Sequence, residues 1–311
     1  MQTPNTLSRR ELLGKVAVFG GAAFACRLGG VHAAAGYSPV LSVQAYIWIQ
    51  HFEKWKKTLG EGVEEMLATF QRAGYRNVDL NDSFFAAPLR VKTLGLLKKN
   101  GLAMPTFYAN SVMHEARMAE QSIKTILELA EATKPAGVRG IVTNPSPKPK
   151  QGRKSDDELA IQARYLNQLG GELKKRGVRL MVHHHTPELV ENAREWRYQL
   201  ANTDPQLVGC CVDLHWAYRG GQEPLAFLRE VGPRLESLHL RNSQGGVWME
   251  DFNDGDVNYR VVADYLKEIA YQGYLVVELA YEDRTKVTRS LEEDLRLSRL
   301  YTEKTFGLHQ G

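Results

Sequence analysis

Three consecutive histidines, His183, His184 and His185, end an apolar run that begins at Arg179, and Glu188 follows three residues later. Side chains alternate between the two faces of a strand, so we expect His183 and His185 on one face and His184 on the other. Two imidazoles on a buried strand need a bound partner, because burying an unsatisfied polar group costs free energy. The cluster therefore indicates a metal site or a proton-transfer site. The alternative is a polar strand end whose histidines meet only water.

Further residues of the same kind stand at the ends of the next three apolar segments. They are Asp213 and His215, then His239 and Arg241, and finally Glu278, with Glu282 a turn further on. Each has a simpler explanation alone: Asp213 can cap a loop, His239 can be a hydrogen-bonded core histidine, and Glu278 can pair with Arg241. The spacing of two residues puts each pair on one strand face. Four matching strand ends favour one divalent metal site, and mixed imidazole and carboxylate ligands suit Mn²⁺, Co²⁺, Zn²⁺ or Fe²⁺ better than Ca²⁺.

The elements that would position these residues follow one repeated pattern, in which a helical stretch ends at Gly or Pro and is followed by a short apolar strand and a polar loop. The predicted strands are Val40–Tyr46, Tyr75–Leu80, Leu102–Tyr108, Val138–Thr143, the histidine stretch from Arg179, Leu207–Asp213, Leu235–Arg241 and Tyr274–Ala280. Eight such units over residues 36–311 predict an α/β fold, a single (β/α)₈ TIM barrel, whose site lies at the carboxyl ends of the strands. The absence of a Gly-rich phosphate motif after any strand argues against a Rossmann fold.

The first 35 residues read as an export signal. Arg9 and Arg10 precede the short apolar run Val16–Ala25, and a small-residue cleavage site ends at Ala35. This pattern predicts a twin-arginine signal, cleavage near Ala35, a periplasmic or otherwise exported protein, and no stable membrane insertion after cleavage. The position of Cys26 leaves lipoprotein anchoring open.

Charge and cysteine content narrow the class of partner. The chain has 40 basic and 36 acidic residues, but residues 1–35 hold four of the basic residues and one of the acidic ones. The remainder is nearly neutral, which gives no reason to expect nucleic acid or an anionic membrane as a partner. Cys210 and Cys211 are neighbours on a predicted strand and are expected to be packing thiols without a disulfide. The sequence leaves a homo-oligomer open.

Aromatic residues accompany the candidate site at several strand ends and in the long loop 242–258. They are Tyr46 and Trp48, Tyr108, Trp216 and Tyr218, and Trp248. Such rings stack on the C–H faces of sugars, and the alternative is that they only fill the core. Trp248 is the best candidate for a lid, because loops after the strands cover barrel sites. No phosphate clamp is evident, so we expect an unphosphorylated sugar.

Four segments carry a family resemblance. They are Val182–Glu188, Asp213–Trp216 followed by Gly220–Pro224, His239–Asn242, and Val277–Glu278. At these segments the chain resembles the xylose isomerase-like TIM-barrel superfamily, the sugar phosphate isomerase/epimerase proteins, near its inosose dehydratase-like and 3-keto-glycoside-processing members. The resemblance covers nearly all of residues 36–311. It implies an enzyme that uses one divalent metal ion, with Mn²⁺ favoured.

The resemblance also implies residue roles. The metal ligands would be His183, Asp213, His239 and Glu278, although His185 or Glu188 can take the place of His183. From the chemistry of the site itself we expect Glu188 or His185 to be the base and Glu278 to bridge metal and substrate. Arg241 and Asn242 depart from the family's usual Lys-Asp, and an arginine at 241 would grip a substrate oxygen or carboxylate. The substrate-binding residues would be His215, Trp216, Tyr46, Trp48, Tyr108 and Trp248.

The function implied is isomerisation or epimerisation, or a lyase or dehydratase reaction, of a keto-sugar, keto-glycoside or cyclitol through a metal-bound enediolate. One alternative is an exported sugar-binding barrel without catalysis. A less favoured alternative is a phosphodiesterase like the apurinic endonucleases, which would need more metal ligands and a basic DNA-binding face. The sequence does not identify the substrate or the stereochemistry.

Overall fold

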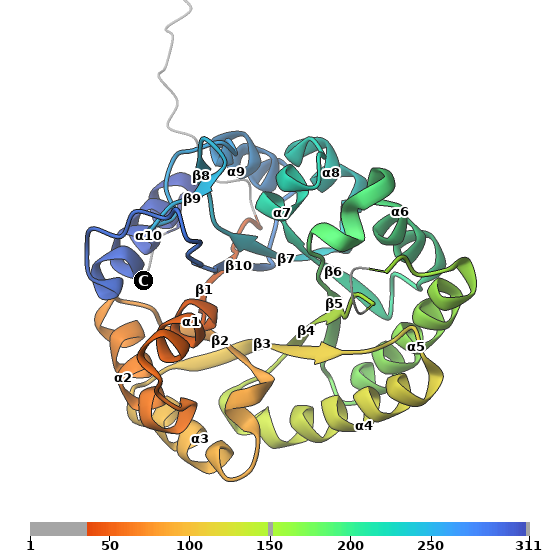
Figure 1. Ribbon diagram of the computed structural model, residues 1–311, viewed down its shortest axis with the longest axis horizontal. Helices are drawn as coiled ribbons and strands as arrows, with labels where there is room; N and C mark the ends of the chain where they lie inside the picture. Colours follow the sequence, from red (N-terminus) through yellow and green to blue (C-terminus); the bar gives the residue numbers. More distant parts are fainter. Residues whose placement is uncertain (1–35, 149–151, 309–311) are drawn as a thin grey trace, which may run out of the picture. The chain divides into compact units, whose positions relative to one another are not determined.

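The strands of the computed structural model, which describes residues 36–148 and 152–308, close into one parallel barrel (Figure 1). Around the barrel the strands follow the order β1, β10, β7, β6, β5, β4, β3, β2. Their bounds are β1 Val40–Gln44, β2 Asn77–Asn81, β3 Ala103–Ser111, β4 Gly140–Pro145, β5 Arg179–Val182, β6 Val208–Asp213, β7 Leu235–Leu240 and β10 Tyr274–Val277. Each strand pairs with its neighbours in sequence, and β1 pairs with β10. The predicted (β/α)₈ barrel is thereby confirmed, and the predicted export signal lies outside the described residues.

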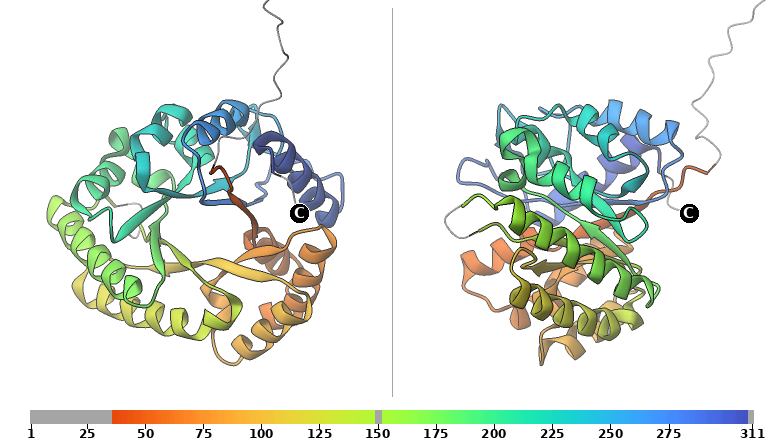
Figure 2. Two further views of the ribbon diagram at one scale, coloured as in Figure 1. Left: turned by 180° about the vertical axis from the view of Figure 1, so that it is seen from behind. Right: turned by 90° about the vertical axis from the view of Figure 1, so that its right-hand side faces the viewer.

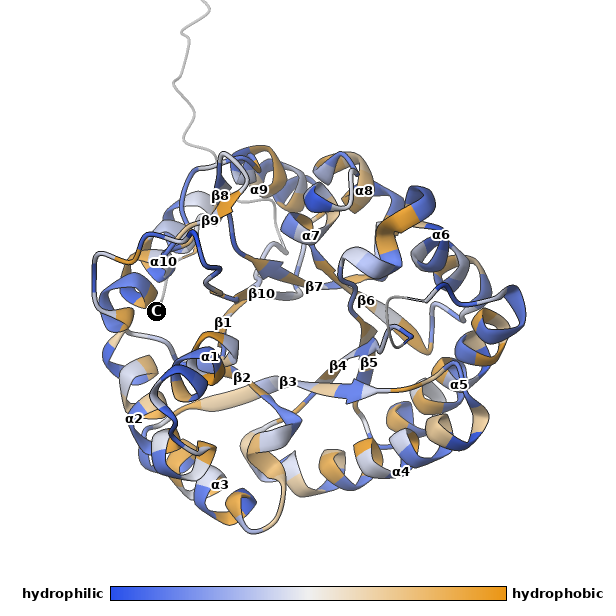
Figure 3. Cartoon of the chain, in the orientation of Figure 1, coloured by the Kyte–Doolittle hydropathy of each residue, from blue (hydrophilic) through white to orange (hydrophobic). Residues whose placement is uncertain are grey.

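Helices surround the barrel in both views of Figure 2. Their bounds are α1 Tyr46–Trp55, α2 Leu59–Arg72, α3 Leu89–Lys99, α4 Ala116–Thr133, α5 Asp156–Lys174, α6 Thr186–Asn202, α7 Leu214–Arg219, α8 Pro224–Val231, α9 Tyr259–Glu268 and α10 Leu291–Phe306. Apolar and polar residues alternate around helices such as α4 and α5 (Figure 3), as expected for helices with one face on the barrel. Ser155 caps α5, since the Glu158 N–H donates to Ser155 Oγ at 3.2 Å, and the spacing of Ser155 and Glu158 is a sequence signal for such a cap. Among the described residues, no helix has the length and apolarity needed to cross a membrane.

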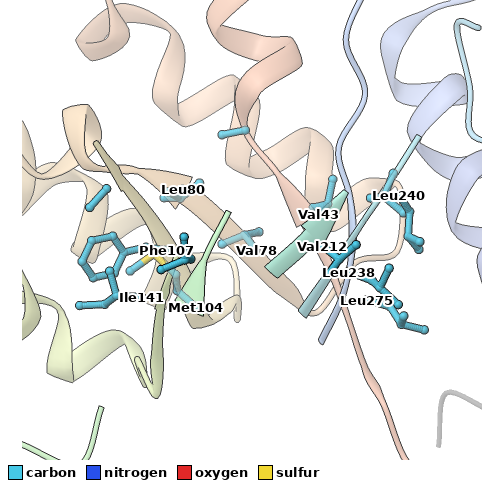
Figure 4. Close-up of a cluster of buried hydrophobic side chains, with 14 of the residues drawn as sticks. Val43, Val78, Leu80, Met104, Phe107, Ile141, Val212, Leu238, Leu240 and Leu275 are labelled. Atoms are coloured by element: carbon cyan, nitrogen blue, oxygen red, sulfur yellow. The ribbon is translucent and has the colours of Figure 1, made fainter. Parts of the chain in front are cut away.

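The main core lies between the outer face of the barrel and the helices. Alternate residues of the strands enter it, among them Val43, Val78, Phe107, Ile141 and Leu238 (Figure 4). Burying each of these side chains contributes on the order of 1.5–3 kcal/mol, so this layer fixes the position of every strand.

The strand residues of opposite parity point into the barrel. Tyr108, Val142, Met181 and Cys211 form a second, smaller apolar cluster there. Cys210 belongs to the outer core instead, and both cysteines are free and buried, as predicted. A register shift in β3 puts both Met104 and Phe107 in the outer core, but the alternation holds toward the carboxyl ends of the strands. The last inward-pointing residues of neighbouring strands therefore meet at one end of the barrel.

Three local elements differ from the prediction. The first strand ends at Gln44, and α1 begins at Tyr46, so Trp48 is a helix residue and not a strand-end residue. The segment after Asp213, expected to extend a strand end, is the helix α7. In the long loop, β8 (Ser243–Gln244) and β9 (Val247–Trp248) form an antiparallel hairpin.

The hairpin turn is made by two glycines in the left-handed region. Gly245 has φ of 59° and Gly246 has φ of 76°, a pair of conformations that other residues rarely adopt together. Their N–H groups donate to the two carboxylate oxygens of Asp256 at 3.0 and 2.7 Å. The turn is therefore anchored to the loop that leads to α9.

Candidate active site

Four predicted residues meet at the carboxyl ends of the strands. His183 follows β5, Asp213 ends β6, His239 lies in β7, and Glu278 follows β10. One ligand-type atom from each lies within 4.8 Å of those of the other three, and all four side chains are buried. The structure thus brings together the ligand set that contains His183, rather than His185 or Glu188.

The chemistry of these side chains fits a metal ion. Both ring nitrogens of His183, and Nε2 of His239, are buried without a hydrogen-bond partner among the described residues. An unsatisfied buried nitrogen costs free energy unless something binds it. Burial lowers the pKa of His183 well below its usual value, and smaller electrostatic effects of His239 and other neighbours of His183 lower it further. The ring is therefore neutral and keeps a lone pair.

Arg241 pairs with two of the four candidate ligands. Its Nε and Nη2 donate to Asp213 Oδ2 at 3.0 and 2.8 Å, and Nη2 also donates to Glu278 Oε2. Nδ1 of His239 lies 2.8 Å from the same Glu278 oxygen. Burial alone would raise the pKa of Glu278, but Arg241 and His239 outweigh it and lower the pKa to about 2. Glu278 therefore pairs with Arg241, as the simpler explanation proposed, and also belongs to the group of candidate metal ligands.

Asp213 has a structural task as well. Its Oδ1 accepts the N–H groups of His215 and Trp216, each at 2.9 Å, and so caps α7. Its Oδ2 faces Arg241, so one carboxylate fixes the helix and takes part in the charged cluster.

A second group of ligand-type residues replaces the carboxylates with a thiol. It consists of His183, Cys211 and His239. Burial raises the pKa of Cys211, which disfavours the thiolate that binds metals. Because the two groups share both histidines, they describe one site rather than a multi-metal centre.

A pocket of about 480 Å³ opens above this cluster. Its lining includes seven of the predicted residues: Tyr46, Tyr108, His185, Trp216, Arg241, Trp248 and Glu278. Arg241 lies under the aromatic wall, with its guanidinium carbon 5.3 Å from the Trp216 ring centre and 5.0 Å from that of Trp248. The pocket thus combines the charged Arg241 and Glu278 with aromatic side walls, a lining typical of small-molecule sites.

The three histidines divide as the strand pattern predicts. The rings of His183 and His185 face each other with centres 4.7 Å apart, and His185 lines the pocket. His184 points the other way and packs against Trp196 and Phe227 in the outer core.

Trp48 does not line the pocket, contrary to the prediction. It is 5% exposed and packs against His51 and Phe52 in the outer core. Since α1 starts at Tyr46, the spacing of two residues turns Trp48 away from Tyr46 on the helix instead of placing both on one strand face.

His215 is also absent from the pocket lining. It is fully buried on α7, where its Nε2 lies 2.8 Å from Ser243 Oγ and its Nδ1 accepts the indole N–H of Trp248 at 3.1 Å. The prediction that His215 and Asp213 share a strand face is wrong, because α7 begins between them. His215 therefore fixes Trp248, which lines the pocket, but does not itself line it.

Trp248 is fixed from a second side by an ion pair. Glu282 accepts the Trp248 backbone N–H at 2.9 Å and binds Arg219 with both oxygens at 3.0 Å. Arg219 donates to Gly246 O at 2.9 Å and stacks 4.6 Å from the Trp248 ring centre. Loops after β6, β7 and β10 are thereby joined at one indole.

Glu188 lies beside the pocket lining and not in it. Its Oε2 accepts the backbone N–H of His185 at 2.7 Å, and its Oε1 is buried without a partner among the described residues. Burial, with the nearby Glu195 as a smaller cause, raises the pKa of Glu188 to about 7. Its observed contact is to the start of α6, where it supports the position of His185.

The opposite wall was not predicted. It is polar and comes from the ends of the first three strands: Gln44, Asn81, Asp82, Ser83 and Asn110. The Gln44 amide donates to Asn81 at 3.1 Å, and Asp82 accepts the Asn110 N–H at 2.9 Å. The sequence does contain a signal for this wall, because amide and carboxylate side chains stand at the ends of β2 and β3. These strand ends carry no histidine, which is the residue that marked the later strands.

Sequence comparison assigns the family. Residues 67–301 match the xylose isomerase-like TIM barrel family, so the chain belongs to it, as the resemblance implied. An inosose dehydratase from Clostridium perfringens is 23% identical over 275 residues, covering 78% of this chain and 90% of the relative. One from Geobacillus kaustophilus is 22% identical and covers 69% and 79%.

Solved structures share the fold. A sugar phosphate isomerase/epimerase from Parabacteroides distasonis has a TM-score of 0.66 at 19% identity, covering 87% of this chain and 95% of the other. An L-ribulose 3-epimerase has a TM-score of 0.68 at 11% identity, covering 86% and 95%. A 3-keto-D-glucoside 4-epimerase from E. coli has a TM-score of 0.65 at 14% identity, covering 86% and 100%.

Proposed function

We propose that this protein is a metal-dependent enzyme that isomerises, epimerises or dehydrates an unphosphorylated keto-sugar, keto-glycoside or cyclitol. The observation that carries the proposal is the meeting of His183, Asp213, His239 and Glu278 in one buried cluster, which reaches an aromatic and polar pocket through Glu278. The inosose dehydratases and sugar epimerases among its relatives support the same reaction class.

The ligand set gives the metal a defined role. His183, Asp213, His239 and Glu278 would hold one divalent ion, for which we favour Mn²⁺. When bound, such an ion polarises a carbonyl and an adjacent hydroxyl and makes the C–H between them more acidic. Two imidazoles and two carboxylates suit Mn²⁺, Co²⁺, Zn²⁺ or Fe²⁺.

The chain itself supplies the proton acceptor and the substrate contacts. We assign proton transfer to His185, which lines the pocket, and not to Glu188, which faces the His185 backbone. Glu278 lines the pocket and belongs to the ligand set, so it stands where metal and substrate meet. Gln44, Asn81 and Asn110 offer hydrogen bonds to sugar hydroxyls.

Substrate charge follows from the pocket lining. Among the described residues that form it, Arg241 is the only arginine or lysine, and Asp213 and Glu278 already pair with its guanidinium. A phosphate group would find no free cation here, which supports an unphosphorylated reacting unit. Export remains part of the proposal, on the strength of the twin-arginine pattern.

Solvent hydrogen exchange tests the reaction. With Mn²⁺ in D₂O, the protein should move deuterium into the carbon beside the carbonyl of a 3-keto-glucoside or an inosose. Glu278→Gln should slow this exchange by roughly 10²–10⁴-fold while circular dichroism shows an intact fold. The control is Glu268→Gln on the exposed face of α9, which should exchange like the parent.

The same experiment separates the alternative of a sugar-binding barrel without catalysis. A binder would show saturable sugar binding and no deuterium incorporation. Full exchange in Glu278→Gln would remove Glu278 from the mechanism.

A further inference from the structure

A second pocket adjoins the candidate active site at Trp248. Its volume is about 610 Å³, and Trp248 lines both pockets. The remaining lining comes from the hairpin, from the segment that follows it to Asn253, and from the loop after β10 that carries Arg284, Lys286 and Arg289. Trp248 is therefore a partition, fixed by His215 and Glu282, between two spaces.

The acidic residues of the second pocket are already paired. Glu250 accepts the Thr288 hydroxyl at 2.7 Å, and Arg289 lies 3.1 Å from Glu250 and 3.0 Å from Asp251. Arg289 also donates through Nε to Asp294 at 2.8 Å. Arg289 thus links three carboxylates and holds the loop after β10 in place. Counted over its lining, the pocket carries three basic side chains against the two acidic ones, Glu250 and Asp251.

Two basic residues are left over. Arg284 and Lys286 are exposed at this pocket, and neither has a hydrogen bond or ion pair with any described residue. Beside them, Val247, Trp248 and Met249 provide an apolar surface. The pocket thus offers two basic side chains without an ion pair, next to Trp248.

This combination defines a chemical class of ligand. A guanidinium and an ammonium bind carboxylate and phosphate oxygens. An indole packs against the C–H face of a sugar ring. A pocket of about 610 Å³ is large enough for a sugar unit.

We propose that the second pocket binds an anionic sugar unit, such as a uronate or a sugar phosphate, through Arg284, Lys286 and Trp248. The shared indole makes it an extension of the first pocket, so a two-unit substrate would place its anionic unit here. Only this extension rests on the proposed function; the binding of the anionic unit does not.

Tryptophan fluorescence of the full chain tests the proposal with D-glucuronate, D-glucose 6-phosphate and D-glucose as probes. At least one anionic sugar should bind about ten-fold more tightly than glucose, as expected for charge-assisted hydrogen bonds, and the tighter of the two identifies the anion. The double variant Arg284→Gln/Lys286→Gln should lose this preference. The matched control Lys98→Gln/Lys124→Gln, on exposed faces of α3 and α4, should keep it.

Equal binding of all three sugars by the parent would overturn the proposal. So would unchanged binding of the anionic sugar by Arg284→Gln/Lys286→Gln, since that result would place the anion elsewhere, for example at Arg241. Neither result depends on metal or turnover, so failure here is distinguishable from failure of the proposed enzymatic function.

Discussion

At the scale of single residues, Glu188 combines burial with an incomplete set of hydrogen bonds. Burial raises its pKa from 4.5 to about 7, so between these pH values the folded protein holds a proton that the unfolded chain has released. The free energy of unfolding therefore falls as pH rises through this window, by about 3 kcal/mol from this group, and stays level above it.

Glu188→Gln tests this directly, because the amide oxygen still accepts the His185 N–H but the side chain no longer titrates. Urea unfolding at pH 4.5 and pH 7.5 should show that the parent loses more stability than the variant over this range. An equal pH dependence of the two proteins' unfolding free energies would contradict the raised pKa that we attribute to the burial of Glu188. Glu268→Gln, on the exposed side of α9, serves as control and should behave as the parent.

In the absence of metal, Arg241 supplies the positive charge that pairs with both carboxylates of the cluster. Arg241→Met would leave Asp213 and Glu278 buried without their cation, and losing one partner of a buried pair costs about 3–5 kcal/mol. We expect a lower melting temperature without metal and a larger upward shift on adding Mn²⁺ than the parent shows, because the ion replaces the lost charge.

The control for Arg241→Met is Arg260→Met, which removes an exposed ion pair with Asp254 and should cost about 1 kcal/mol or less. Calorimetry with and without Mn²⁺ measures both effects. An equal Mn²⁺ shift in parent and Arg241→Met would show that the guanidinium and the metal do not share the two carboxylates.

At the scale of elements, the β8–β9 hairpin depends on Glu282, which ties Trp248 to Arg219. Glu282→Ala removes these charge-assisted bonds, each worth about 1.5–3 kcal/mol. We expect faster amide exchange in the hairpin and roughly a ten-fold higher KM, with a smaller change in kcat. Unchanged exchange and KM would show that the hairpin holds Trp248 without Glu282, and Glu268→Ala is the control.

The sequence predicts long, periodic elements better than short ones. The eight strands and the cap at Ser155 were predictable because alternation and capping act locally. The helices α1 and α7 were not, since each begins within two residues of a strand end, and α7, with 6 residues, is too short to show a period. The hairpin was marked by Gly245 and Gly246, a turn signal read only as a loop.

The same distinction applies to the candidate site. Histidine and carboxylate at matching strand ends identified the buried cluster, because strand register carries them to one place. The places of Trp48 and His215 could not be predicted, since they depend on where α1 and α7 start. The polar wall at Asn81 and Asn110 shows that strand ends without histidine carry the same positional information.

At the scale of the molecule, strands far apart in sequence converge because the barrel closes between β1 and β10. Closure places Gln44 and Asn81 across from His185 and Trp216 around one pocket. Glu278 joins that pocket to the buried cluster of His183, Asp213 and His239, and we propose that this cluster binds one divalent metal ion.

Metal analysis of the purified protein, beside Asp213→Ala and His239→Ala, tests that claim most directly. If the cluster binds a metal, the parent should contain about one equivalent of Mn, Co, Zn or Fe, and both variants should lose it while circular dichroism confirms that they fold. A parent without metal even after reconstitution with Mn²⁺, Co²⁺, Zn²⁺ and Fe²⁺, or folded variants that retain a full equivalent, would contradict it.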